Sequence, residues 1–176
     1  TVIGMNYTYG PEATYPFAVH QLNDGLAYIL DHADELHVDA SRIILAGDSA
    51  GAQLTSQLAV LATSPSYASE MGIEPALSAD NLQGVILNCG IYRMLAMLGG
   101  KGILAWGDDT SLWAYTGDRN LTNSAAMAQM SSYDFVTADF PATYISGGNA
   151  DPLTDLQSKP LADRLTSLGV DVTPLF

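Results

Sequence analysis

The sequence is poor in cysteine, in basic residues and in long apolar runs, and each shortage excludes a class of protein. Cys89 is the single cysteine, so no disulfide can form within the chain, and the composition fits a reducing compartment such as the cytoplasm. Six Lys and Arg residues stand against 19 Asp and Glu, which leaves a net charge of −13. We therefore expect no nucleic-acid partner. No apolar run approaches the roughly 18 residues of a membrane-spanning helix.

At 176 residues the chain is long enough for one ordinary domain, which buries roughly 70% of the surface that its unfolded chain exposes. The acidic residues are scattered and form no block, so we interpret them as a source of solubility. Strand and helix patterns alternate along the chain without an internal repeat or a linker. This order predicts one α/β domain over residues 1–176, with a mostly parallel sheet and helices on both faces.

Apolar periodicity and turn residues predict the individual elements. Buried strands are predicted at residues 1–7, 42–46, 82–88, 142–148 and 170–176. Amphipathic helices are predicted at residues 17–38, 52–62 and 160–168, and a surface loop with a short helical piece at residues 64–81. Residues 91–140 have weak periodicity and many Met and Trp residues. Either they form a lid or pocket wall for an acyl chain, or they pack on the core.

The segment around Ser49 is the strongest functional signal in the sequence. Gly47-Asp48-Ser49-Ala50-Gly51 is a GxSxG pentapeptide between a predicted buried strand and a predicted helix. A serine on so sharp a turn is held in a strained conformation that exposes its hydroxyl, and the flanking glycines leave room for the crossing chains. The pattern predicts that Ser49 is a nucleophile. The backbone N–H of Ala50, at the start of the helix, is predicted to form part of an oxyanion hole.

A serine nucleophile needs a base and an acid that orients the base. Asp151 is the predicted acid because it follows a parallel strand, where open α/β sheets place catalytic groups. Asp155 is the rival, and an N-cap role is the structural alternative for Asp151.

No histidine in the sequence is a convincing base. His20, His32 and His37 all lie in the helix predicted before Ser49. His32 and His37 are about 140° apart around such a helix, so they do not form a metal pair. We interpret each histidine as a surface or partly packed residue.

Four short motifs together resemble those of a known enzyme family. They are the GDSAG elbow at residues 47–51, a Tyr-x-x-x-Pro-Glu loop at residues 7–12, the VDASRI segment at residues 38–43 and an Asp-Pro-Leu-x-Asp segment at residues 151–155. The chain resembles, over essentially its whole length, an α/β-hydrolase of the hormone-sensitive-lipase-like esterase group. This resemblance implies that Ser49 is the nucleophile and that Asp151 is the acid of the catalytic triad.

Two parts of that family's pattern are missing from this sequence: a His-Gly-Gly-Gly oxyanion loop and a catalytic histidine after the last strand. The resemblance also places one further strand between those ending at Tyr7 and Ala46, and a sheet without it exposes unpaired edges. We therefore expect a fragment of a longer enzyme, incomplete at both ends, with little activity by itself. An intact mass of the natural gene product near 18.6 kDa would contradict this expectation.

The resemblance implies that the complete enzyme hydrolyses short- to medium-chain acyl esters through a Ser-His-Asp triad, with the histidine outside this sequence. Two alternatives stay open: a serine peptidase or other acyl hydrolase on the same fold, and a non-catalytic ligand-binding relative. No metal or organic cofactor is expected. The expected partners are a small-molecule ester and the remaining part of the same polypeptide. We expect no membrane span, and a homodimer stays open.

Overall fold

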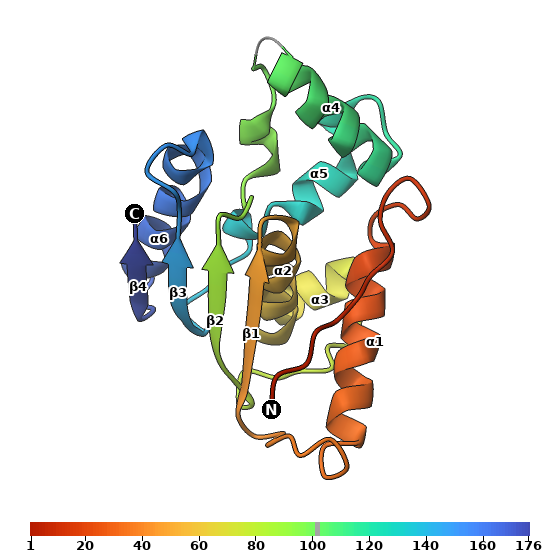
Figure 1. The fold of residues 1–176 in the computed structure, drawn as a ribbon, viewed down its shortest axis with the longest axis vertical. Helices are drawn as coiled ribbons and strands as arrows, with labels where there is room; N and C mark the ends of the chain where they lie inside the picture. Colours follow the sequence, from red (N-terminus) through yellow and green to blue (C-terminus); the bar gives the residue numbers. More distant parts are fainter. Residues whose placement is uncertain (101–102) are drawn as a thin grey trace.

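A parallel sheet runs through the centre of the computed structural model, which describes residues 1–100 and 103–176 (Figure 1). In these residues the sheet has four strands in the order β1-β2-β3-β4. The strands are β1 (Ile43–Asp48), β2 (Leu82–Asn88), β3 (Ala142–Ser146) and β4 (Val172–Leu175). All neighbouring pairs are parallel, and helical crossovers connect them. The prediction of an α/β fold with a parallel sheet is confirmed.

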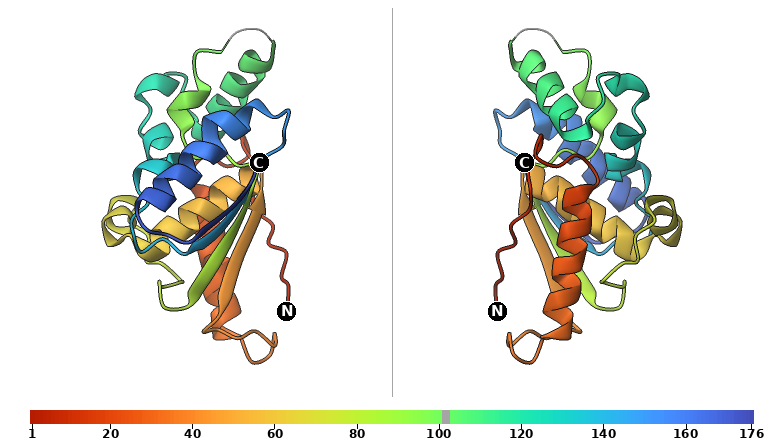
Figure 2. Two further views of the ribbon diagram at one scale, coloured as in Figure 1. Left: turned by 90° about the vertical axis from the view of Figure 1, so that its left-hand side faces the viewer. Right: turned by 90° about the vertical axis from the view of Figure 1, so that its right-hand side faces the viewer.

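The helices that pack on the sheet cover one of its faces. The α-helices of the described residues are α1 (Phe17–Asp31), α2 (Ala50–Thr63), α3 (Pro65–Met71), α4 (Ile103–Thr116), α5 (Ala125–Met130) and α6 (Lys159–Ser167). Figure 2 places α2 and α6 on the same side of the sheet. On the opposite face of β1, Ile44 is 61% exposed and Ala46 is exposed as well. Within the described residues, the sheet thus differs from the expected arrangement with helices on both faces.

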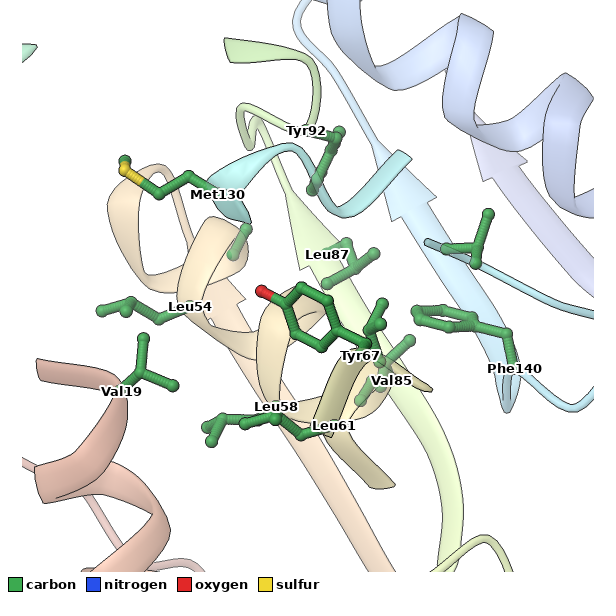
Figure 3. Close-up of a cluster of buried hydrophobic side chains, with 14 of the residues drawn as sticks. Val19, Leu54, Leu58, Leu61, Tyr67, Val85, Leu87, Tyr92, Met130 and Phe140 are labelled. Carbon is green, nitrogen blue, oxygen red and sulfur yellow. The ribbon is translucent and has the colours of Figure 1, made fainter. Parts of the chain in front are cut away.

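The core lies between α2 and the sheet. Leu54, Leu58 and Leu61 recur at helical spacing on α2 and are buried. Figure 3 shows them in one cluster with Val85 and Leu87 of β2. Because α2 begins directly after β1 and is buried from Ala52 to Leu61, its packing fixes the position of the turn that joins the two elements. None of the helices described by the structure combines the length and the apolar character needed to cross a bilayer.

Two of the predicted elements differ from the structure. Residues 1–7 form no strand; they are mostly exposed and lie apart from β1 (Figure 2). Their apolar run resembles a strand, but a strand needs a neighbour to satisfy its backbone groups, and residues 1–7 pair with no strand in the described part of the chain although the outer edge of β1 is open there. The helix predicted to Val38 ends at Asp31. Asp34 and Glu35 follow, and negative charges at a helix C-terminus oppose the helix dipole.

The segment between β2 and β3 lies beyond the carboxyl ends of the strands (Figure 1). It contains α4, α5 and the 3₁₀ turns Met94–Met97, Leu121–Asn123 and Ser132–Asp134. Met94, Met127 and Met130 are buried in the core, whereas Ile103 and Trp106 are exposed. This segment corresponds to the predicted insertion at residues 91–140, of which residues 101–102 lie outside the described part.

Candidate active site

Ser49 is the single residue between β1, which ends at Asp48, and α2, which begins at Ala50. Its φ of 53° and ψ of −117° lie in a region that L-residues rarely occupy. Hydrogen bonds hold this conformation on both sides. The Ser49 N–H donates to the Asn88 carbonyl oxygen at 2.9 Å, and the Ser49 carbonyl oxygen accepts from the Gln53 N–H at 3.1 Å. The predicted strand, turn and helix are therefore present, and Ser49 is exposed on the turn.

The two glycines that flank Ser49 have different roles. A Cβ at Gly47 would overlap the Gly51 carbonyl group and lie 2.6 Å from the Ala52 nitrogen, so only glycine fits where the strand and helix cross. A Cβ at Gly51 would meet no described heavy atom within 4 Å. The expectation that both glycines make room for the chain therefore applies to Gly47 alone in the described structure.

This difference predicts opposite effects for the same substitution. Gly47→Ala is expected to lower the free energy of unfolding by roughly 3 kcal/mol, because rigid backbone atoms must move to admit the methyl group. Gly51→Ala is expected to raise it by about 0.5 kcal/mol, because alanine favours a helix. Urea unfolding of the two variants measures both values. Equal losses in the two variants would contradict the assignment.

Ala50 is the first residue of α2, and the first N–H groups of a helix lack a partner within it. The first turn of α2 contains no acidic residue, so no carboxylate of that turn competes for the partial positive charge at the helix N-terminus. An anion formed beside Ser49 would therefore lie next to a favourable partial charge.

Asp151 and Asp155, the two candidate acids, have different surroundings. Asp151 follows the loop that leaves β3, and its side chain is half-buried. Its Oδ1 accepts a hydrogen bond from the Leu153 N–H at 2.9 Å. This contact is the N-cap interaction considered as a structural alternative, and it uses one of two carboxylate oxygens. The Asp155 side chain is 78% exposed and pairs with Lys159 at 2.6 Å. Asp155 thus faces solvent at the surface of the π-helical turn Thr154–Ser158.

Ser49 and Asp151 follow strands whose carboxyl ends meet at one edge of the sheet. β1 and β3 are separated by β2 alone, which corresponds to a lateral distance of roughly 10 Å. Beyond the strand ends, the Cys89 N–H donates to the Ser146 carbonyl oxygen at 3.0 Å, and the Ser146 hydroxyl donates to Asn88 Oδ1 at 2.8 Å. These bonds join the ends of β2 and β3, and the bond from the Ser49 N–H to the Asn88 carbonyl oxygen joins the end of β1 to β2. The structure therefore brings Ser49 and Asp151 to the same edge.

The histidines lie elsewhere. His32 follows the last residue of α1 and His37 lies in the turn beyond it, at the opposite edge of the sheet from Ser49 (Figure 1). His20 is exposed on α1, which packs against α2. No group of three or more His, Cys, Asp or Glu side chains in residues 1–100 and 103–176 could hold a metal ion.

A groove of about 510 Å³ lies beside α4. Trp106 and Trp113 line it from α4, and Arg119 lies over the Trp113 ring, with its Cζ 4.1 Å from the ring centre. Neither Ser49 nor Asp151 lines this groove. It is therefore a feature of the insertion and separate from the strand ends that Ser49 and Asp151 follow.

Three buried glutamines at this end of the molecule, Gln53, Gln57 and Gln157, were not predicted from the sequence. Two of them had a signal in the sequence, because Gln53 and Gln57 are polar residues four apart within a predicted apolar helix. Gln157 had none, since its burial depends on a turn that brings it against a distant segment.

A sequence model of the BD-FAE family matches residues 1–165. Among solved structures, the chain is similar to carboxyl esterase 2 from the mycorrhizal fungus Tuber melanosporum, with 20% identity, a TM-score of 0.73 and coverage of 97% of this chain and 54% of that one. It is also similar to fungal esterases from Rhizomucor miehei, with 23% identity, a TM-score of 0.71 and coverage of 97% and 53%. A bacterial heroin esterase shares 27% identity, with a TM-score of 0.70 and coverage of 96% and 52%.

The chain thus spans about half the length of these solved structures. The family match covers most of the chain, and the structural matches agree with the parallel sheet described above. The chain belongs to the BD-FAE family, and its fold is that of the α/β-hydrolases.

Proposed function

We propose that the complete polypeptide containing this chain is a serine carboxylester hydrolase that acts on short- to medium-chain acyl esters. The observation that carries the proposal is Ser49, an exposed residue on a strained turn between a parallel strand and a helix N-terminus. Backbone strain of this kind persists only where the surroundings hold it, and it clusters at active sites. The similar solved structures include proteins named as esterases, which supports the same class of reaction.

In the proposed mechanism, Ser49 Oγ attacks the ester carbonyl carbon while a histidine from outside this sequence takes the serine proton. The carbonyl oxygen becomes an oxyanion and accepts a hydrogen bond from the Ala50 N–H. The histidine then gives the proton to the leaving alkoxide as the ester C–O bond breaks. Water attacks the acyl-enzyme in the same way and releases the acid. No metal or organic cofactor takes part.

Asp151 is the proposed acid of this triad. It accepts a hydrogen bond from the histidine and so keeps the ring in the orientation that receives the Ser49 proton. The separation of roughly 10 Å between the ends of β1 and β3 leaves room for one imidazole ring with a hydrogen bond on each side. The second oxygen of the Asp151 carboxylate serves this contact, since Oδ1 accepts from Leu153.

The insertion at residues 91–140 is proposed to form the wall of the substrate cleft. Its position beyond the carboxyl ends of the strands supports this role (Figure 1). The exposed apolar side chains on α4, Ile103 and Trp106, can contact the acyl or alcohol part of an ester. The remaining part of the same polypeptide is proposed to cover the exposed face of β1, where Ile44 is 61% exposed.

A fluorophosphonate probe tests this proposal in the complete polypeptide, because it forms a covalent bond only with an activated serine. We expect one adduct, located on Ser49 by peptide mass spectrometry. A parallel series of p-nitrophenyl esters is expected to give the highest kcat/KM with short acyl chains. An adduct on another serine, or turnover of peptides instead of esters, would contradict the proposal.

A further inference from the structure

Three glutamine side chains, Gln53, Gln57 and Gln157, are buried near the carboxyl edge of the sheet, with exposed fractions of 4%, 0% and 0%. A primary amide carries two N–H donors and one carbonyl acceptor, and burying it without partners is costly. These amides therefore need partners within the fold. Most of those partners lie in residues 92–130, which are part of the segment between β2 and β3.

Gln157 holds the start of that segment. It lies in the π-helical turn Thr154–Ser158, six residues after Asp151. Its Oε1 accepts hydrogen bonds from the N–H groups of Tyr92 at 3.0 Å and Arg93 at 2.8 Å, and its Nε2 donates to the Arg93 carbonyl oxygen at 3.2 Å. One side chain thus satisfies three backbone groups just after the chain leaves β2. π-Helical turns are rare and occur frequently at functional sites.

Gln53 and Gln57 hold the end of the segment. α5 ends at Met130, and the last carbonyl groups of a helix lack partners within it. Gln53 Nε2 donates to the Met130 carbonyl oxygen at 3.1 Å and to Gln57 Oε1 at 2.7 Å. The Tyr67 hydroxyl accepts from Gln57 Nε2 and donates to the Gln129 carbonyl oxygen, both at 2.7 Å. Burial raises the pKa of Tyr67, which keeps this hydroxyl protonated as a donor.

We call these two groups of hydrogen bonds, those of Gln157 and those of Gln53 and Gln57, the two anchors. Both anchors are connected to the segments that carry the candidate catalytic residues. The Gln53 N–H donates to the Ser49 carbonyl oxygen at 3.1 Å, so this anchor begins within one helical turn of the strained serine. On the other side, Thr154 belongs to the same π-helical turn as Gln157 and donates through Oγ1 to the Gly148 carbonyl oxygen at 2.9 Å. Gly148 lies in the loop that leads to Asp151 and accepts a hydrogen bond from the Asp151 N–H at 3.1 Å.

We propose that Gln53, Gln57 and Gln157 are positioning residues that fix residues 92–130 to the Ser49 turn at one end and to the Asp151 loop at the other. In this arrangement Gln53 and Gln57 set the distance of the cleft wall from Ser49, and Gln157 sets the position of Asp151. The kinetic consequences rest on the proposed ester hydrolysis. The anchoring itself rests only on the hydrogen bonds described above.

Methionine variants test both anchors, because Gln157→Met and Gln57→Met remove the amide and keep an unbranched side chain of similar length. Gln157→Glu is the conservative variant, since a carboxyl oxygen can still accept from the Tyr92 and Arg93 N–H groups. Gln83→Met is the matched control, because Gln83 is exposed on β2.

Amide hydrogen exchange measures the anchoring without any assay of activity. In Gln157→Met the N–H groups of Tyr92 and Arg93 lose their acceptor, and we expect their exchange to accelerate by roughly 10- to 100-fold. Gln157→Glu should retain most of the protection, and Gln83→Met should leave it unchanged. Unchanged exchange of Tyr92 and Arg93 in Gln157→Met would overturn the proposal.

The kinetic arm uses the complete polypeptide, with rates expressed per active site titrated by the fluorophosphonate. Gln157→Met is expected to lower kcat roughly 10- to 100-fold on every ester with little change in KM, and Gln157→Glu to recover most of the loss. Gln57→Met is expected to raise KM increasingly with acyl length, to roughly tenfold for the longest chain.

If a glutamine variant loses titratable active sites but keeps kcat and KM per site unchanged, that glutamine has a structural role only. This result would overturn the positioning roles. If the unmodified polypeptide hydrolyses no ester, the proposed function fails instead, and the exchange measurement then decides the anchoring by itself.

Discussion

Replacement of Ser49 by alanine is expected to lower the kcat for ester hydrolysis by the complete polypeptide by on the order of 10⁶-fold. Without the hydroxyl, no acyl-enzyme can form, and only substrate binding and the oxyanion-binding groups remain to favour the reaction. Alanine retains the Cβ of serine and removes no backbone hydrogen bond of the turn. The fold is therefore expected to persist, and steady-state hydrolysis of a p-nitrophenyl ester measures the loss directly.

Ser69→Ala is the matched control for this experiment, because Ser69 is exposed on α3 and lies outside the candidate site. It should leave both the rate and the circular dichroism spectrum unchanged. If Ser49→Ala retained the rate of the unmodified polypeptide, the proposed nucleophile would be wrong.

Replacement of Asp151 by asparagine is expected to lower kcat by on the order of 10⁴-fold. The amide is nearly the same size as the carboxylate, and its carbonyl oxygen can still accept from the Leu153 N–H, so the loop should keep its shape. The missing negative charge, however, no longer stabilises the protonated base or selects its reactive tautomer. Steady-state kinetics should therefore report a large fall in kcat without a comparable change in KM.

Asp155→Asn distinguishes the two candidate acids. Its carboxylate is mostly exposed and forms a surface pair with Lys159, which has little effect on stability. We expect this variant to keep nearly full activity. A greater loss in Asp155→Asn than in Asp151→Asn would reverse the assignment.

The sequence predicted well the elements whose patterns are local. The strand predicted at residues 82–88 has the observed bounds of β2, and the helix predicted at residues 160–168 lies within one residue of α6 at each end. Both are defined by apolar spacing and by turn residues at their ends. The strand predicted at residues 1–7 failed because a strand depends on a neighbour, which apolar spacing cannot supply.

The candidate site was predictable only where it depends on a local sequence pattern. The turn at Ser49 follows from its two glycines and from the change of apolar period around it, so the pentapeptide sufficed to place it. The different surroundings of Asp151 and Asp155 could not be read in the same way. They lie four residues apart in one motif, and their exposure depends on how the turn after β3 packs.

By itself, the sequence determined the α/β class, the parallel sheet and the strand, turn and helix that carry Ser49, because side-chain size and spacing act over a few neighbouring residues. Only the tertiary structure decided that one face of β1 stays exposed and that three glutamines become buried. A buried amide is stable only beside specific backbone groups, and those of Tyr92, Arg93 and Met130 come from segments far away in the chain. Folding alone brings them together.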